Sequence, residues 1–181
     1  HVGEAAARNL VPCTGELGGK GPLLGFDGCD LETAARKAAG QFDDSGQVCL
    51  AGTRLLVQEG VADAFLELFH RFTDEHVLGD PRDDATTISP MIHPDHVERV
   101  LGFIGRARAN GDEIVRGGER RAEGGLFVEP TLVRPRSNES EIVQREIFGP
   151  VLTFQTFRDE DEAIGLANST ALAPSQGDPG A

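Results

Sequence analysis

The chain has 181 residues, which is long enough for one domain with its own hydrophobic core. Its 17 basic and 30 acidic residues give a formal net charge of −13, which argues against partners such as nucleic acid or an anionic membrane surface. No apolar run reaches the roughly 20 residues that span a bilayer, and we expect no signal peptide. The three cysteines, Cys13, Cys29 and Cys49, form no C-x-x-C pair, which favours a reducing, cytoplasmic setting over a disulfide framework or a zinc site.

The first half of the chain alternates helical patterns with short extended ones. The Ala-rich residues 4–10 predict a helix, and Asp30 is a good N-cap for a second helix at 31–39. Residues 55–57 form a short apolar run that predicts a buried strand. Between residues 61 and 72, apolar side chains recur at i, i+4, i+7, i+8 and i+11, which predicts an amphipathic helix.

The second half continues this alternation. His93 and His96 flank Pro94, which fits a helix start, and no other His or Cys cluster in the sequence lies near enough to suggest a metal site. The next helix has its apolar face at residues 97–104 and ends at Gly111. The remaining expected elements are extended segments at 114–115, 127–128, 131–133 and 151–157 and a last helix at 160–168.

Helices of about ten residues that alternate with short apolar strands predict βαβ units. We therefore expect an α/β fold in which residues 16–168 form an open, mostly parallel sheet with helices on both faces. From Ala171 the composition changes to small and polar residues that cannot bury a core face. This change predicts a disordered tail.

Cys49 is the strongest candidate for chemistry. Gly46 before it and Gly52 after it keep bulky side chains away, so that a substrate carbonyl could approach the sulfur. A structural cysteine usually lies among large apolar residues, although a free cysteine also often packs as a small hydrophobe. From these residues alone, a nucleophilic Cys49 and a buried structural one both stay open.

The glycines between residues 16 and 21 exclude a regular helix and predict a strand end or loop that carries Glu16. A phosphate-binding loop is the competing interpretation. Its spacing does not fit, because Lys20 is followed by Gly21 where such a loop needs Ser or Thr.

Three stretches, in this order, together resemble signatures of the NAD(P)-dependent aldehyde dehydrogenase superfamily. Residues 42–53 resemble its active-site cysteine signature (the cysteine stretch), residues 15–22 its glutamate signature (the glutamate stretch), and residues 146–151 its Glu-Ile-Phe-Gly-Pro-Val sequence (the EIFGPV stretch). Gly21 departs from the glutamate signature, where Ser, Ala, Asp or Asn is usual. The resemblance covers about residues 2–170 and includes shorter stretches at 79–81, 89–92 and 127–131.

The resemblance implies a role for each of four residues. Cys49 would attack an aldehyde to give a thiohemiacetal, and its backbone N–H would help to hold the oxyanion. After hydride transfer to NAD or NADP, Glu16 would activate the water that hydrolyses the thioester. Glu146 would hydrogen-bond the ribose of the nicotinamide, with Phe148 packing beside it. Without the resemblance, a lone Glu is more often a solvated charge, although the Leu-Gly-Gly that follows Glu16 argues against a purely surface role. Glu146 alone would be read as a helix or turn charge.

The resemblance also implies how this chain relates to a longer protein. Residues 1–15 would end the cofactor-binding domain, residues 16–168 would form a partial catalytic domain, and residues 169–181 would be a disordered tail that departs from the family. The main cofactor-binding domain and the segment that forms the subunit interface would lie outside this chain. The partner would be a small aldehyde or semialdehyde, and the full-length protein would be a homo-oligomer.

Three functional interpretations stay open. The chain is a segment of an NAD(P)-dependent aldehyde dehydrogenase that is inactive on its own, a truncated remnant that only folds or associates, or a cofactor-independent thiol esterase or acyl-transfer module that needs Cys49 and Glu16. The carboxylates at 43–44 oppose ionisation of the nearby thiol, which argues against full reactivity. We expect Cys49 to be the reactive thiol and Cys13 and Cys29 to be structural.

Overall fold

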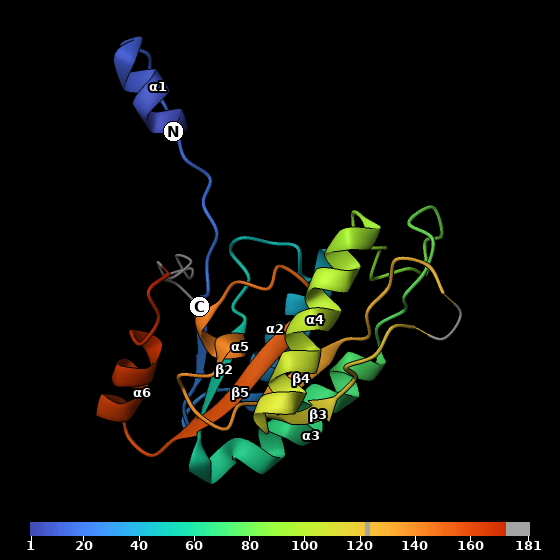
Figure 1. Ribbon diagram of the computed structural model, residues 1–181. Coiled ribbons are helices and arrows are strands. Elements are labelled where there is room, and N and C mark those ends of the chain that lie inside the picture. The colour runs from blue at the N-terminus through green and yellow to red at the C-terminus, as the bar shows by residue number, and fades with distance from the viewer. Residues whose placement is uncertain (122–123, 173–181) are drawn as a thin grey trace.

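The computed structural model describes residues 1–121 and 124–172. Its centre is a five-stranded sheet with the strand order β1-β2-β5-β4-β3 (Figure 1). The strands are β1 (Pro22–Gly25), β2 (Arg54–Gln58), β3 (Glu113–Arg116), β4 (Thr131–Arg134) and β5 (Val151–Phe157). β3 pairs with β4 in the antiparallel direction, and the other three pairings are parallel. The prediction of an α/β fold with a mostly parallel sheet is confirmed.

Helices cover both faces of this sheet, as the sequence predicts. The covering helices are α2 (Leu31–Ala39), α3 (Ala62–Asp74), α4 (Pro94–Asn110), α5 (Glu141–Gln144) and α6 (Glu160–Ala167). The described residues also form α1 (Val2–Arg8) and the 3-10 turns η1 (Gly40–Gly46) and η2 (Glu59–Val61). The side chains of β5 contribute to two separate buried clusters, because successive side chains of a strand point to opposite faces of the sheet. Leu152 and Phe154 pack with buried residues of α2 and α3, whereas Val151 packs with α4 and α5.

Local sequence signals set the helix ends where the sequence predicts them. The Asp30 side chain accepts hydrogen bonds from the backbone N–H of Glu32 and Thr33, which caps α2. His93 caps α4, with Pro94 in the first turn, and Gly111 ends that helix in the left-handed conformation. Phe65, Phe69 and Phe72, from the stripe predicted between residues 61 and 72, are buried in the core.

The first 18 residues stand apart from the rest of the chain. α1 has no buried residue, and Figure 1 shows it separated from the sheet at the end of an extended segment. Of residues 1–18, only Ala6 is half-buried and the others are exposed. The sheet and the helices that cover it therefore make up one packed body, and α1 does not contribute to its core.

The predicted C-terminal tail is described only at its start. Ser169 donates a hydrogen bond to the Leu166 carbonyl at 2.6 Å, so the predicted tail begins in contact with α6. Residues 173–181, the greater part of that tail, lie outside the described residues. Over the described ranges, no helix is both long enough and apolar enough to cross a membrane. The same ranges hold no group of three or more His, Cys, Asp or Glu side chains arranged for a metal ion.

Candidate active site

The strand order brings the three signature stretches together. The glutamate stretch leads into β1, the cysteine stretch into β2, and the EIFGPV stretch into β5. β1, β2 and β5 are neighbours and run parallel, so their amino ends lie at one edge of the sheet. Segments separated by up to 127 positions in the chain thus meet at that edge.

The cysteine stretch makes a sharp turn before Cys49. Residues 44–46 have consecutive positive φ angles of 51°, 56° and 65°. The Ser45 hydroxyl donates to the Ser89 carbonyl, and the Gln47 side-chain oxygen accepts from the backbone N–H of Ile92 at 3.1 Å. The segment at 89–92 therefore holds this turn in place from outside the cysteine stretch.

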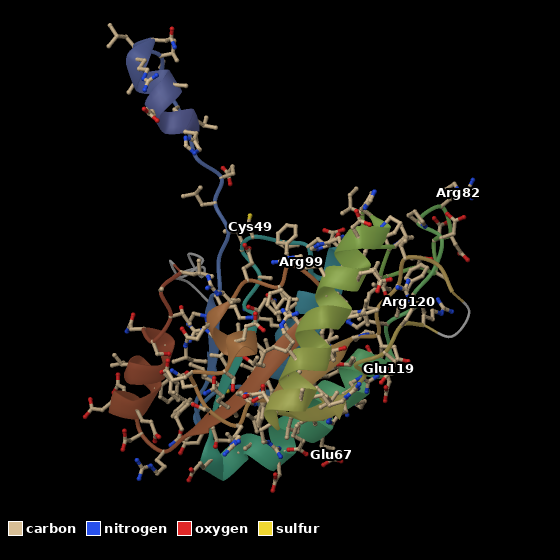
Figure 2. All side chains as sticks on the ribbon, viewed as in Figure 1. Cys49, Glu67, Arg82, Arg99, Glu119 and Arg120 are labelled. Atoms are coloured by element: carbon tan, nitrogen blue, oxygen red, sulfur yellow. The ribbon has the colours of Figure 1, made fainter. Side chains whose placement is uncertain are left out.

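Cys49 itself is half-buried, and Figure 2 places its sulfur at the surface of the body. Its neighbour Leu50 is 65% exposed, and the chain turns back at Ala51, whose N–H bonds the Val48 carbonyl at 3.1 Å. A cavity of about 200 Å³ lies beside the loop. It is lined by residues on both sides of the cysteine, namely Gly40, Gln41, Asp43, Val48, Leu50 and Ala51. Partial burial raises the pKa of the Asp43 carboxyl in this cavity, and the nearby His76 opposes the shift.

The other two cysteines do not have the environment expected for structural residues. Cys13 and Cys29 are both exposed. The physical reason is local: Cys13 lies on the segment that packs against nothing, and Cys29 lies in the turn before α2. Exposure therefore does not distinguish Cys49 as the most reachable thiol.

The EIFGPV stretch contacts both of the other stretches. Its Glu146 carboxylate accepts a hydrogen bond from the backbone N–H of Gly19 at 3.0 Å, and a Cβ on Gly18 would overlap the same carboxylate. A Cβ on Gly46 would overlap the carbonyl oxygen of Gly149. Glycine is needed at Gly46, where a Cβ would meet backbone atoms, whereas at Gly18 a Cβ would meet the end of the Glu146 side chain.

Two side chains of α4 hold the EIFGPV stretch on its outer side. Arg99 donates to the backbone carbonyls of Glu146, at 2.9 Å, and of Ile147. The Nε2 atom of His96 lies 2.6 Å from the Phe148 carbonyl oxygen. Phe148 has a positive φ of 60°, and its side chain remains 37% exposed. The sequence analysis missed Arg99 and His96 as site residues, although their spacing of three positions puts them on one helix face.

Glu16 is not brought to any partner. It is exposed on the segment before Gly19 and makes no hydrogen bond or ion pair among the described residues. Its role as a base toward Cys49 stays a prediction.

Lys20 is a buried cation of the glutamate stretch, next to the buried Arg54. Its side chain is 1% exposed, and its Nζ has no hydrogen-bond partner within the part of the chain that the structure describes. Burial, together with the nearby positive charge of Arg54, lowers its pKa from 10.5 to about 7, and the Glu146 carboxylate partly opposes this shift. The sequence analysis considered Lys20 only as a phosphate ligand, because its burial depends on the fold.

Comparisons with known proteins agree on one family. A family model described as the aldehyde dehydrogenase family matches residues 1–177. A betaine aldehyde dehydrogenase of Cereibacter sphaeroides is 40% identical over 178 residues, which cover 98% of this chain and 37% of that protein. An aminoaldehyde dehydrogenase of Arabidopsis thaliana is 40% identical over 169 residues, which cover 92% of this chain and 34% of that protein.

Solved structures give the same picture. The NAD-dependent aldehyde dehydrogenase of Sinorhizobium meliloti superposes with a TM-score of 0.88 at 42% identity, over 93% of this chain and 34% of that one. The betaine aldehyde dehydrogenase of Staphylococcus aureus in complex with NAD+ has a TM-score of 0.87 at 38% identity, over 94% of this chain and 35% of that one. The chain thus spans about a third of the length of the relatives that it matches.

Proposed function

The chain belongs to the aldehyde dehydrogenase family, and from this premise we propose that it is a catalytic segment of an NAD(P)-dependent enzyme that oxidises a small aldehyde to a carboxylic acid. One observation carries the proposal. The EIFGPV stretch packs on the glutamate stretch through Glu146 and on the cysteine stretch through Gly149, so the stretches that carry Cys49, Glu146 and Phe148 meet at one edge of the sheet.

In this proposal Cys49 is the nucleophile. Its thiolate attacks the aldehyde carbon, the carbon–oxygen π electrons move to oxygen, and the backbone N–H of Cys49 donates to that oxygen. A bound nicotinamide supplies the acceptor for the hydride that leaves this carbon. The product on Cys49 is a thioester. Glu16 takes a proton from a water that attacks the thioester carbon, the carbon–sulfur bond breaks, and the acid departs as the thiol is regenerated.

Two residues of the EIFGPV stretch fit the nicotinamide end of a dinucleotide. The Glu146 carboxylate uses one oxygen for the Gly19 N–H, and the described residues donate no hydrogen bond to the other. That oxygen could accept from a ribose hydroxyl. The partly exposed ring of Phe148 offers a flat apolar surface beside it. Glu146 and Phe148 would therefore bind and orient the cofactor at its reactive end only.

The names of the relatives suggest the class of substrate. The relatives are named for betaine aldehyde and for aminoaldehydes, which are both small aldehydes. The Met-Ile-His-Pro sequence at 91–94 adds a weaker suggestion of a semialdehyde. We further propose that the full-length protein is a cytoplasmic homo-oligomer.

The test uses the full-length polypeptide that contains this sequence, purified with and without Cys49→Ala. We expect NADH or NADPH formation from betaine aldehyde or another small aldehyde, abolished by Cys49→Ala and unchanged by Cys29→Ala, which removes an exposed thiol away from the loop. Equal loss in both variants, or activity retained in Cys49→Ala, would refute the nucleophile. Hydrolysis of an activated ester without any cofactor, in the absence of aldehyde oxidation, would favour the thiol esterase instead.

A further inference from the structure

Two side chains of α4 contact the backbone of the EIFGPV stretch at three successive carbonyl groups. Arg99 donates from one terminal nitrogen to the Glu146 carbonyl at 2.9 Å and from the other to the Ile147 carbonyl. The Nε2 atom of His96 lies 2.6 Å from the Phe148 carbonyl oxygen. Because a carbonyl oxygen can only accept, this contact requires a hydrogen on Nε2 of His96. We call these two side chains the α4 clamp.

The arginine of the α4 clamp differs from the other arginines of its helix. α4 carries three arginines, of which Arg106 pairs with Glu141 at 2.7 Å and Arg108 with Glu119 at 2.8 Å. Arg99 forms no ion pair among the described residues, and both of its terminal nitrogens donate to backbone carbonyls. Hydrogen bonds from a charged donor are stronger than those between neutral groups. The charge of Arg99 therefore strengthens the contact with the backbone of the EIFGPV stretch.

Phe148 is the residue of this stretch whose backbone needs such support. Its φ of 60° lies in the left-handed region, which a bulky side chain rarely adopts and which costs free energy. In that conformation the carbonyls before and after the residue point the same way, whereas in extended backbone they point in opposite directions. The carbonyls of Ile147 and Phe148 do both face α4. The α4 clamp thus favours the left-handed conformation over the extended one.

The glutamate and cysteine stretches hold the residues on either side of Phe148. Gly19 donates to the Glu146 carboxylate at 3.0 Å, and the Gly149 carbonyl lies against Gly46. Within the described residues, the hydrogen-bond partner of the Phe148 backbone belongs to the α4 clamp. The imidazole of the clamp also lies beside the Phe148 ring, with ring centroids 6.1 Å apart. The backbone and the ring of Phe148 are therefore both supported from α4.

We propose that the α4 clamp positions the EIFGPV stretch: by holding three successive carbonyls, it keeps Phe148 in the left-handed conformation and fixes its ring relative to the Glu146 carboxylate. Arg99 and His96 are thus positioning residues. The consequence for catalysis rests on the proposed function, in which the ring and the carboxylate orient the reactive end of the cofactor. The conformational part needs no cofactor, so it can hold or fail independently of the enzymatic activity.

The first measurement uses the 181-residue chain without cofactor. A residue with positive φ gives a strong intraresidue HN–Hα cross-peak in a NOESY spectrum, because these two hydrogens lie closer together than at negative φ. The unaltered chain should show this cross-peak for Phe148. We expect Arg99→Gln and His96→Ala each to weaken it severalfold. Each variant removes one half of the α4 clamp, so either one decides the point if the other does not fold.

Arg106→Gln is the matched control. The Arg106 guanidinium lies over the Phe103 ring, as that of Arg99 does, with distances to the ring centroid of 4.6 and 5.0 Å. Its hydrogen bonds go to Glu141 instead of the EIFGPV stretch. Arg106→Gln should therefore leave the Phe148 cross-peak unchanged, and an equal weakening in this control would overturn the proposal.

The second measurement uses the full-length polypeptide and separates positioning from a general loss of structure. Arg99→Gln and His96→Ala should each lower kcat/KM for NAD or NADP about tenfold, since misplacement of reacting groups by about 1 Å can cost about a hundredfold. The rate at which iodoacetamide alkylates Cys49 should not change. Arg99→Lys and His96→Gln each keep a donor and should recover part of the loss.

The outcomes of the two measurements are distinguishable. A Phe148 cross-peak that is unchanged in both Arg99→Gln and His96→Ala would overturn the proposal whatever the activity. A weakened cross-peak with unchanged cofactor kinetics would overturn the role in positioning the cofactor. A full-length protein that oxidises no aldehyde would count against the proposed function, and the cross-peak would still decide whether the α4 clamp holds Phe148.

Discussion

Gly46 is the residue at which the cysteine stretch and the EIFGPV stretch touch. Its φ of +65° disfavours any side chain, and a Cβ would overlap the Gly149 carbonyl. We expect Gly46→Ala to lower the free energy of unfolding by about 2–4 kcal/mol, the sum of backbone strain and displacement of the neighbouring loop. Urea unfolding of the 181-residue chain measures this loss. Gly28→Ala is the matched control, because nothing lies within 4 Å of its Cβ position, and a loss of equal size there would contradict the explanation.

Lys20 should leave a signature in the pH dependence of stability. Its pKa is about 7 in the folded chain and 10.5 ordinarily, so between these values the unfolded chain binds more protons than the folded chain. Stability then rises with pH in that window by up to about 1.4 kcal/mol per pH unit, and below pH 7 the cost of burying the cation is fully present. Lys20→Met should remove the slope. The free energies of unfolding of Lys20→Met and of the unaltered chain, measured with urea, should differ less at pH 9 than at pH 7. A difference that stays constant with pH would contradict the lowered pKa of Lys20.

Some residues of the candidate site lie in short local motifs, and others are identified only by contacts with distant parts of the chain. Cys49, Glu146 and Phe148 can be found in the sequence because each lies inside a short recognisable stretch. Arg99 contacts Glu146 across 47 positions, and this contact depends on α4 lying beside the start of β5. Burial of Lys20 likewise depends on the order of the strands. Such contacts have no local pattern, so the sequence analysis could not assign them.

Secondary structure could be predicted from sequence where the signal is local. α2, α4 and β5 begin and end close to the predicted positions, because caps, prolines and apolar periodicity act over a few residues. The antiparallel direction of β3 was beyond such signals. β3 and β4 pair as neighbours in the chain without a crossover helix between them, and only the complete sheet shows that arrangement.

Glycines inside helices offer a test at the scale of one element. Gly105 lies in α4, and nothing is within 4 Å of where its Cβ would be. Gly105→Ala should therefore raise the free energy of unfolding by about 0.5–1 kcal/mol, because alanine loses less backbone entropy in a helix. Thermal unfolding measures the gain. Gly149→Ala provides the contrast: its Cβ would lie 2.6 Å from a Val100 methyl of the same helix, and it should destabilise the chain.

At the scale of the whole molecule, strand order is what makes the site. Three stretches that are distant in sequence become neighbours only because β1, β2 and β5 are adjacent and parallel. Each stretch leads into its strand, so one edge of the sheet brings together Cys49, the Gly18–Gly19 backbone and Glu146. The same architecture explains why α1 is not needed for this assembly, since it lies before the first strand and packs on no part of the sheet.

Removal of residues 1–15 should therefore leave the stability of the body unchanged. α1 buries no residue, and the segment that follows it is exposed up to Gly18, so its loss removes no apolar surface from the core. We expect the urea midpoint and the slope of the transition to stay the same, since the slope follows the surface exposed on unfolding. Removal of residues 1–25 is the matched comparison, because it also deletes Lys20 and the four register pairs of β1 with β2. That longer deletion should cost about 3 kcal/mol or more through loss of core contacts and exposure of a new strand edge. A clear loss of stability from the shorter deletion would show that the first 15 residues pack on the body after all.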